Sequence, residues 1–304
     1  MFICDSHAHW LPEEIINNAH FFHKGWSDIQ AHVQMMQAVG IAKTVLTYPT
    51  TDAYSKLGGH ANVARIYNDR VAEIVRRHPR NFVGAAILPG GDSARMMDEL
   101  KRATQELGFK AISMASNYDN VYLDDKGFLP VYKEAARKNI PIFVHPQIVK
   151  PIGSERVQDP LLTPVIEYIF DTTICVGKLL TSDVLREYAD VKFVFAHFGG
   201  VTPFLVQRFD DTYRMLRSMN FVKDLKGDPR QYLKNIYMDT SGDKTKANFM
   251  AALDLVGPKH ILWGSDWPAK TDPTASMQAV RDLDISEQDK EDILGGNFER
   301  ILGH

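Results

Sequence analysis

The sequence predicts an α/β protein with the fold of a (β/α)8 TIM barrel of the metal-dependent hydrolase type. Short apolar runs recur along the chain, and helical patterns separate them. The runs are nearly continuous rather than alternating, which is typical of parallel strands covered on both faces. Several runs end in His or Asp, at the end of the strand where barrel enzymes place their catalytic side chains. A doubly wound open sheet is the competing architecture.

The predicted strands are short runs rich in β-branched and other apolar residues. Each run has the length of a buried strand and is followed by a polar or helical segment. In chain order the runs are 1–9, 43–48, 82–89, 110–115, 140–146, 191–200, 235–241 and 260–268.

Helices are predicted between several of these strands, most clearly over 61–79, 92–108 and 128–140, where apolar residues recur at helical spacing. The first pattern ends before a proline, and the second opens with an Asp or Ser cap and closes on Gly108. We expect residues 1–304 to form a single domain, because one barrel accounts for a chain of this length.

Three segments are too long to be simple connections: 10–34, 147–176 and 208–235. The last of them reads as a long helical excursion. We expect these segments to be insertions at the C-terminal face of the barrel, where they are candidate lids or subunit contacts.

The composition excludes several classes of partner. The formal net charge of −3 argues against a nucleic-acid or anionic-membrane surface. No apolar run approaches the ~20 residues that span a bilayer. Cys4 and Cys175 lie in apolar stretches and form no CxxC pair, so we expect reduced cysteines in a cytoplasmic protein.

Five ionisable residues stand at the ends of predicted strands. His7 and His9 share a face of the first strand, because alternate residues of a strand point the same way. His145, His197 and Asp266 end later strands, so a barrel brings all five to one mouth. A lone HxH pair is a weak signal. The joint occurrence favours a metal site, because buried ionisable groups are costly unless they are paired or ligating, and these donors suit Zn²⁺ or another divalent first-row ion.

The motifs around these residues resemble a known family. The segments "DSHAHWLP", "RNFVGAAILP", "IPIFVHP", "FAHFGG", "YMDTSG" and "ILWGSDWP" are similar to those of the amidohydrolase-related family, which includes aminocarboxymuconate-semialdehyde decarboxylase and the resorcylate-type decarboxylases. The resemblance covers essentially the whole chain. It implies one divalent ion per chain, Zn²⁺ first and Mn²⁺ as the alternative, with His7, His9, His145 and Asp266 as ligands and His197 as a catalytic residue.

The resemblance also bears on metal count and assembly. Binuclear relatives bridge two metals with a carboxylated lysine at the end of the fourth strand, whereas Lys110 stands at the beginning of that strand. We therefore expect a single ion. The resemblance further implies a homodimer, for which the segment 208–235 offers a surface.

Two reactions fit the same residues. In non-oxidative decarboxylation, the metal withdraws charge from the substrate's carboxylate or a neighbouring hydroxyl, and His197 and Asp266 handle a proton as CO2 leaves. In hydrolysis of a lactone, ester or amide, a metal-bound water attacks the carbonyl, with Asp266 as base and His197 polarising the oxygen. Lactonases related to the family that this chain resembles can also work without a metal, so a metal-free hydrolase is part of this alternative. The resemblance favours decarboxylation. A binding protein that has lost its chemistry is disfavoured, because the five-residue set is intact.

Aromatic residues flank the predicted site residues and suggest a planar substrate. Trp10, Phe198 and Trp267 neighbour His9, His197 and Asp266, and they form either a slot for a ring or ordinary wall packing.

Arg208 matches an arginine that in decarboxylase relatives reaches the substrate carboxylate, sometimes from the neighbouring subunit. A guanidinium suits a carboxylate geometrically. The alternative is a surface ion pair with Asp210 or Asp211. The first arginine of the chain is Arg65, so the early-loop arginine of the muconate-semialdehyde decarboxylase is missing. A small aromatic or unsaturated carboxylic acid is therefore the expected substrate.

Overall fold

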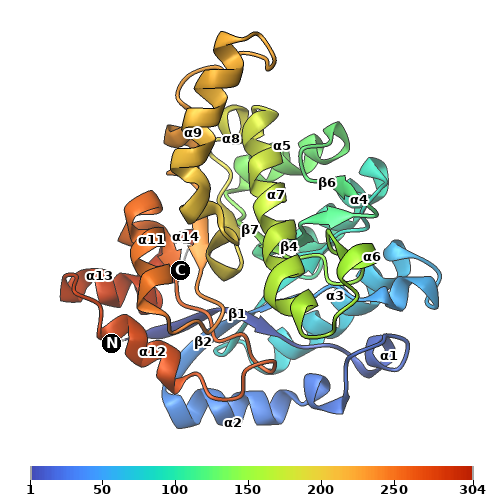
Figure 1. Cartoon of the computed structure of the whole chain (residues 1–304). Coiled ribbons are helices and arrows are strands. Elements are labelled where there is room, and N and C mark those ends of the chain that lie inside the picture. Colours follow the sequence, from blue (N-terminus) through green and yellow to red (C-terminus); the bar gives the residue numbers. More distant parts are fainter. Residues whose placement is uncertain (1, 303–304) are drawn as a thin grey trace.

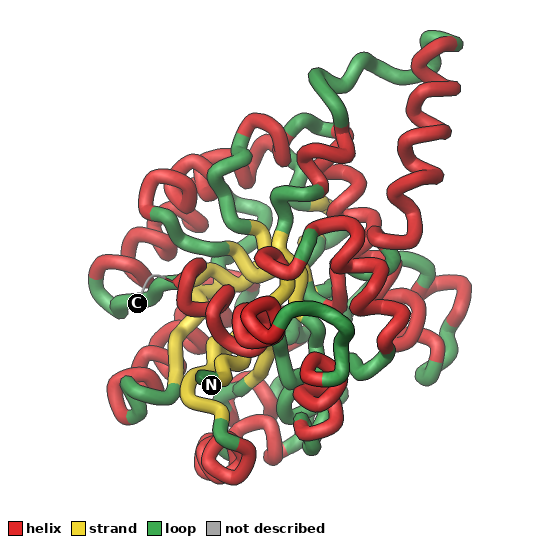
Figure 2. The backbone as a smooth tube through the Cα atoms, turned by 90° about the vertical axis from the view of Figure 1, so that its left-hand side faces the viewer, coloured by secondary structure: helices red, strands yellow, loops and turns green. Residues whose placement is uncertain are grey.

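A ring of eight parallel strands forms the centre of the protein in the computed structural model, which describes residues 2–302. Helices surround the strands (Figure 1; Figure 2). The barrel strands are β1 (Ile3–His9), β2 (Ile41–Thr47), β3 (Phe82–Ile87), β4 (Ala111–Ala115), β7 (Ile142–His145), β8 (Phe193–Phe195), β9 (Tyr237–Asp239) and β10 (Ile261–Leu262). They pair in this order, so the predicted (β/α)8 barrel is confirmed.

Backbone contacts bring the first and last strands together. Ser6 N donates to the carbonyl of Trp263 at 3.0 Å, and Ala8 forms a parallel bridge with Trp267. Further along, Asp266 N donates to the carbonyl of His7 at 2.8 Å. The sheet is therefore nearly closed on itself and is not a doubly wound open sheet. This closure places the Asp266 turn beside the histidines of β1.

The helices follow the strands as predicted, with shifts of a few residues at their ends. For example, α4 begins where the carboxylate of Asp92 accepts from Arg95 N at 3.1 Å, which caps the helix as the sequence predicts. The longer helices are α2 (Ile29–Val39), α3 (His60–Arg77), α4 (Ser93–Gln105), α5 (Leu129–Lys138), α7 (Tyr168–Thr181), α9 (Thr202–Ser218), α11 (Lys246–Val256) and α12 (Thr274–Arg281). The shorter ones are α1 (Glu13–Ile16), α6 (Ser154–Val157), α8 (Val184–Glu187), α10 (Pro229–Leu233), α13 (Glu287–Glu291) and α14 (Asn297–Leu302).

The third long segment differs from its prediction. Helix α9 begins at Thr202, six residues before the predicted excursion, and ends at Ser218. Asn220 then adopts a left-handed φ of 59°, and α10 begins only at Pro229. The helical excursion predicted over 208–235 therefore consists of the end of α9, a loop and α10, because the left-handed residue and the proline interrupt the helix. Both views show α9 and the loop after it projecting from the body (Figure 1; Figure 2).

The other two long segments contain short helices. Residues 10–34 form α1, the 3-10 turn Lys24–Ser27 and the start of α2. Residues 147–176 form α6, a π-helical turn at Thr163–Glu167 and the first part of α7. An additional hairpin, β5 (Asn117–Tyr118) with β6 (Val121–Tyr122), follows β4 and was not predicted.

The barrel interior is apolar at one end and polar at the other. An apolar cluster that includes Cys4, Val45 and Phe143 fills the amino-terminal end, where Phe298 of α14 packs against it. Cys4 and Cys175 are both buried, unpaired thiols, as predicted. Within residues 2–302, none of the helices has both the length and the apolar character needed to cross a bilayer.

Candidate metal centre and active site

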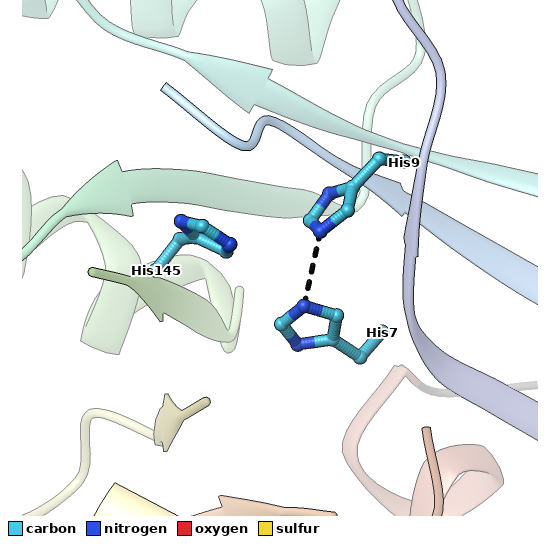
Figure 3. Close-up of side chains that lie close together, drawn as sticks. All are labelled: His7, His9 and His145. Carbon is cyan, nitrogen blue, oxygen red and sulfur yellow. Dashed lines mark hydrogen bonds between the residues drawn. The ribbon is translucent and has the colours of Figure 1, made fainter. Parts of the chain in front are cut away.

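Three buried histidines converge at the carboxyl-terminal mouth of the barrel. His7 and His9 lie on β1, and His145 is the last residue of β7. Their ligand nitrogens lie within 4.8 Å of one another, and the Nε2 atoms of His7 and His9 are 3.1 Å apart. The rings point toward a common centre (Figure 3). The structure thus brings together three of the four predicted ligands through the alternation of β1 and the end of β7.

The outward nitrogen of two of these rings is held by a backbone carbonyl. His9 Nδ1 is 3.1 Å from the carbonyl oxygen of Thr47, and His145 Nδ1 is 2.8 Å from that of Pro146. A carbonyl oxygen only accepts, so each Nδ1 carries the proton and each Nε2 presents a lone pair to the centre. This is the tautomer that a metal-binding histidine requires.

A carboxylate orients the third ring. Asp239, the last residue of β9, places Oδ2 at 2.9 Å from His7 Nδ1. Burial opposes protonation of His7, but the charge and hydrogen bond of Asp239 outweigh it and raise the pKa of His7. If both rings are neutral with the proton on Nδ1, the lone pairs on the two Nε2 atoms face each other at 3.1 Å and repel. A proton or a metal ion between these two nitrogens is therefore favoured. The donor set therefore fits a cation.

Asp266 completes the set of predicted ligands. Its Oδ1 lies 3.6 Å from Nε2 of His7 and 3.6 Å from Nε2 of His9. Burial alone favours a higher pKa for this carboxyl, but its polar contact with His9 and the charges of His7 and His197 hold the pKa of Asp266 well below the usual range. Asp266 is thus an anionic oxygen donor beside the imidazoles, and three imidazole nitrogens with one carboxylate suit a divalent first-row ion.

The electrostatics keep the other imidazoles neutral. Burial lowers the pKa of His9 despite the contact with Asp266. Burial and the neighbouring rings of His9 and His7 hold the pKa of His145 well below its ordinary value. Neutral imidazole is the form that binds metal, so these shifts agree with a ligand role.

His197 lies at the edge of the cluster and lines the pocket. Its ring centroid is 5.4 Å from that of His7, and burial lowers the pKa of His197 to about 4. Its backbone N donates to Ser241 Oγ at 2.9 Å and lies 3.3 Å from Asp239 Oδ1. These contacts hold His197 and the following Phe198 at left-handed φ values of 53° and 56°, a conformation that non-glycine residues adopt only when their surroundings fix it.

Two positioning residues were missed by the sequence analysis. Asp239 touches both His7 and the backbone of His197, as described above, and the available signal was an aspartate that ends an apolar strand. Asp5 is fully buried and accepts from Ser265 N at 2.8 Å, so it fixes the turn that carries Asp266. Asp5 precedes the HxH pair in the same strand, and nothing in the sequence pointed to its partner.

A pocket of about 630 Å³ opens beside the cluster. Most of its wall is apolar or aromatic, and much of that wall comes from the long insertions. Its lining includes His9, Phe21, Phe22, Trp26, His145, Ile148, Val165, Tyr168, Ile169, His197, Phe198, Phe204, Thr240, Ser241, Asp243, Asn248, Asp266 and Lys270.

Only one of the three aromatic residues predicted to contact substrate lines this pocket, and it is Phe198. Trp10 is buried and donates from Nε1 to the carbonyl of Ser27 at 2.8 Å, while Trp267 packs near His32. Neither tryptophan is among the described residues that line the pocket, so both pack behind its wall. Trp26, Phe21 and Phe22 supply the aromatic surface instead.

Arg208 also lies away from the pocket of its own chain. It is exposed on α9 and lines a separate groove with Leu205 and Phe209. A contact between Arg208 and the substrate of a neighbouring subunit stays a prediction.

A (β/α)8 barrel with imidazoles and carboxylates at its mouth has the architecture of the metal-dependent barrel enzymes. Residues 4–304 match the amidohydrolase family model, and the chain belongs to this family.

Individual relatives agree with this assignment. The chain is 27% identical over 244 residues to 2-amino-3-carboxymuconate-6-semialdehyde decarboxylase of Dictyostelium discoideum, covering 80% of this chain and 67% of that protein. It is 25% identical to gamma-resorcylate decarboxylase of a Polaromonas species, covering 97% and 96% of the two chains. It also superposes on the crystal structure of a Polaromonas dihydroxybenzoic acid decarboxylase with bound manganese and 2-nitroresorcinol. The TM-score is 0.83 at 23% identity, covering 99% of this chain and 96% of that one. That last likeness establishes the fold.

Proposed function

We propose that this protein is a metal-dependent, non-oxidative decarboxylase of a small aromatic or unsaturated carboxylic acid. The observation that carries the proposal is the convergence of His7, His9 and His145 with Asp266 at the floor of an aromatic-walled pocket. The relatives named above, which are decarboxylases, support the same reaction class.

The proposed ion is held by His7, His9, His145 and Asp266. A divalent ion at this position supplies Lewis acidity, which withdraws electron density from an oxygen of the bound acid. We propose Zn²⁺ as the ion, since imidazole donors suit it, with Mn²⁺ as the alternative. Manganese in the Polaromonas structure supports a divalent ion in this family.

The chain's own residues provide orientation and proton transfer. Decarboxylation breaks the bond between the carboxylate carbon and the neighbouring substrate carbon. The electron pair stays on that carbon, CO2 leaves, and a proton takes its place, so no oxidant or reductant is needed. His197, which faces the pocket and is neutral near pH 7, moves this proton together with Oδ2 of Asp266, the carboxylate oxygen nearer Lys270.

The pocket walls present aromatic surfaces beside the histidine cluster. Trp26 stacks on His9 with an interplanar angle of 20°, and Phe22 packs edge-on against Trp26. A planar ring fits against such surfaces because aromatic groups favour offset-stacked and edge-to-face contacts. This geometry supports an aromatic or dienoic acid over a flexible aliphatic one.

The test is CO2 release from a panel of hydroxybenzoates and muconate-like acids by the purified protein, with metal content measured on the same sample. We expect turnover that is lost on chelation and restored by Zn²⁺ or Mn²⁺. Silence across the acids, with turnover of lactones, esters or amides, would overturn the proposal in favour of the hydrolase alternative.

We further propose a cytoplasmic homodimer. The unpaired thiols of Cys4 and Cys175 favour a reducing compartment. Helix α9 carries exposed Phe204, Leu205 and Met215, which offer an apolar surface for a second copy. Light scattering of the purified protein tests the assembly, and a monomer at micromolar concentration contradicts it.

A further inference from the structure

Lys270 is the one lysine or arginine among the described residues that line the pocket. It follows the Asp266 turn, and its backbone N donates to the carbonyl of Asp266 at 2.9 Å. The side chain is 46% exposed, so the ammonium is reachable from the pocket space. No motif or spacing in the sequence predicts a role for it.

The ammonium group of Lys270 has donors to spare. Nζ donates to the carbonyl oxygen of Ser241, and it lies 3.7 Å from Oδ2 of Asp266, which is beyond hydrogen-bonding distance. An ammonium carries three N–H donors. Donors are therefore left over on Lys270, which lines the pocket together with Asn248.

This polar wall lies apart from the apolar wall. Ser241, Asp243 and Asn248 come from the region after β9, and Lys270 from the turn after β10. The carboxylate of Asp243 accepts from Asn248 Nδ2 at 2.8 Å and from Thr245 N at 2.6 Å, so donors of its own segment engage both of its oxygens. The remaining walls are built largely by aromatic and aliphatic side chains such as Trp26, Tyr168 and Ile169. The pocket thus has one polar strip, in which Lys270 is the cation, and one largely apolar surface, in addition to the histidine cluster at its floor.

We infer that Lys270 forms a subsite for a second acidic group on the substrate, a carboxylate or a phenolic oxygen, distinct from the carboxylate that is lost. This inference rests on the proposed function, because the reacting carboxylate is assigned to the histidine cluster. A substrate without a second acidic group displaces water from the spare donors of Lys270 without replacing the lost hydrogen bonds, which costs binding free energy. A substrate with one forms a charge-assisted hydrogen bond while its ring lies on the apolar wall.

The experiment measures equilibrium binding to the metal-loaded protein by calorimetry. The probes are benzoate, the three benzenedicarboxylates and the three hydroxybenzoates, so that the second group is tried at each ring position. We expect at least one disubstituted acid to bind more tightly than benzoate. A preference among the dicarboxylates identifies a carboxylate as the second group, and a preference among the hydroxybenzoates identifies a phenolic oxygen.

Variants at Lys270 then assign the preference. In Lys270→Met we expect the preferred acid to bind about 10- to 100-fold more weakly, while benzoate binding stays within about twofold. Lys270→Arg retains most of the preference. Lys246→Met removes the same charge at an exposed position outside the pocket and controls for long-range electrostatics. Metal content per chain is measured for each variant and is expected to be unchanged.

The subsite would be overturned by a wild-type protein that binds no disubstituted acid more tightly than benzoate, or by a preference that survives in Lys270→Met. Equal weakening of all acids also contradicts it, because Lys270 would then act on the reacting carboxylate or through Asp266. The proposed function is judged separately by CO2 release. A lysine-dependent preference without any decarboxylation overturns the reaction and leaves the subsite standing.

Discussion

The two ends of the barrel satisfy their buried charges in different ways. At the amino-terminal end, the buried carboxylate of Asp292, in the π-helical turn Asp292–Gly296, pairs with Lys259 and lies 3.3 Å from a guanidinium nitrogen of Arg300. At the mouth, His9 and His145 are anchored through Nδ1 and direct their Nε2 atoms inward. The amino-terminal end is therefore complete within the chain, whereas the mouth is arranged for a ligand. The former stabilises the fold and the latter supplies function.

The largest expected effect is at the mouth, in His145→Ala. Removing one of three imidazoles destroys the donor set, so we expect loss of bound metal and a loss of decarboxylation of at least about 100-fold. Metal analysis and CO2 release measure the two effects. His20→Ala is the matched control, because His20 is an exposed histidine paired with Asp52. A variant that keeps both metal and activity would show that His145 is not a ligand.

A smaller effect is expected one contact further out, in Asp239→Asn. The substitution removes the charge that orients His7 and that lies near the backbone of His197. We expect metal affinity to fall about 10- to 100-fold, as is usual when the partner of a ligating histidine is changed. A competition titration with a metal chelator measures it. Asp254→Asn, at an exposed position, is the control, and equal affinities in the two variants would contradict the role of Asp239.

The next prediction compares a tryptophan that lines the pocket with a tryptophan that is buried behind the pocket wall. Trp26 lines the pocket and Trp10 does not, although both are buried near the end of β1. We expect Trp26→Phe to weaken binding of an aromatic acid about 2- to 10-fold, the range for one aromatic contact. Trp10→Phe should leave binding unchanged. Fluorescence or calorimetric titration compares the two, and the reverse order would mean that the ring lies on the other side of His9.

These differences also explain how much the sequence could predict. His7 and His9 were predictable because alternation on a strand fixes their shared direction, and His145 and Asp266 because the ends of parallel strands meet at one mouth. The fold followed from the same apolar runs. Trp10 and Trp267 were predicted to contact substrate because each is adjacent in sequence to a site residue. Successive residues of a strand point to opposite faces, so each tryptophan points away from the side that its neighbour faces.

The pocket wall was not predictable in the same way. Trp26, Phe22 and Tyr168 come from insertions whose path depends on tertiary packing rather than on a repeating pattern. Lys270 reaches the pocket because the turn after Asp266 folds back toward Ser241, a contact between residues far apart in the chain. Arg208 illustrates the opposite case: the sequence motif pointed to this residue, but its side chain is exposed on α9 and lies outside the pocket of its own chain.

The smallest effect on activity is expected at the amino-terminal end, in Asp292→Asn. This carboxylate lies far along the barrel from the pocket, so CO2 release at saturating substrate should be unchanged. The free energy of unfolding should fall by about 1–2 kcal/mol at neutral pH, because the pairing with Lys259 and Arg300 loses its charge while both cations stay partly exposed.

The pH dependence of this last effect has a defined sign. Burial alone favours a higher pKa for Asp292, but Lys259 and Arg300 outweigh it and lower the pKa in the folded protein. The ionised carboxylate therefore stabilises the fold above the pKa of an unfolded aspartate, about 4, and this stabilisation is lost as pH falls below that value. Chemical denaturation of wild type and Asp292→Asn at a series of pH values should show a difference that is largest near pH 7 and vanishes in acid. A difference that persists in acid would mean that Asp292 stabilises the amino-terminal end through packing rather than charge, and the contrast between the two ends of the barrel would then rest on the mouth alone.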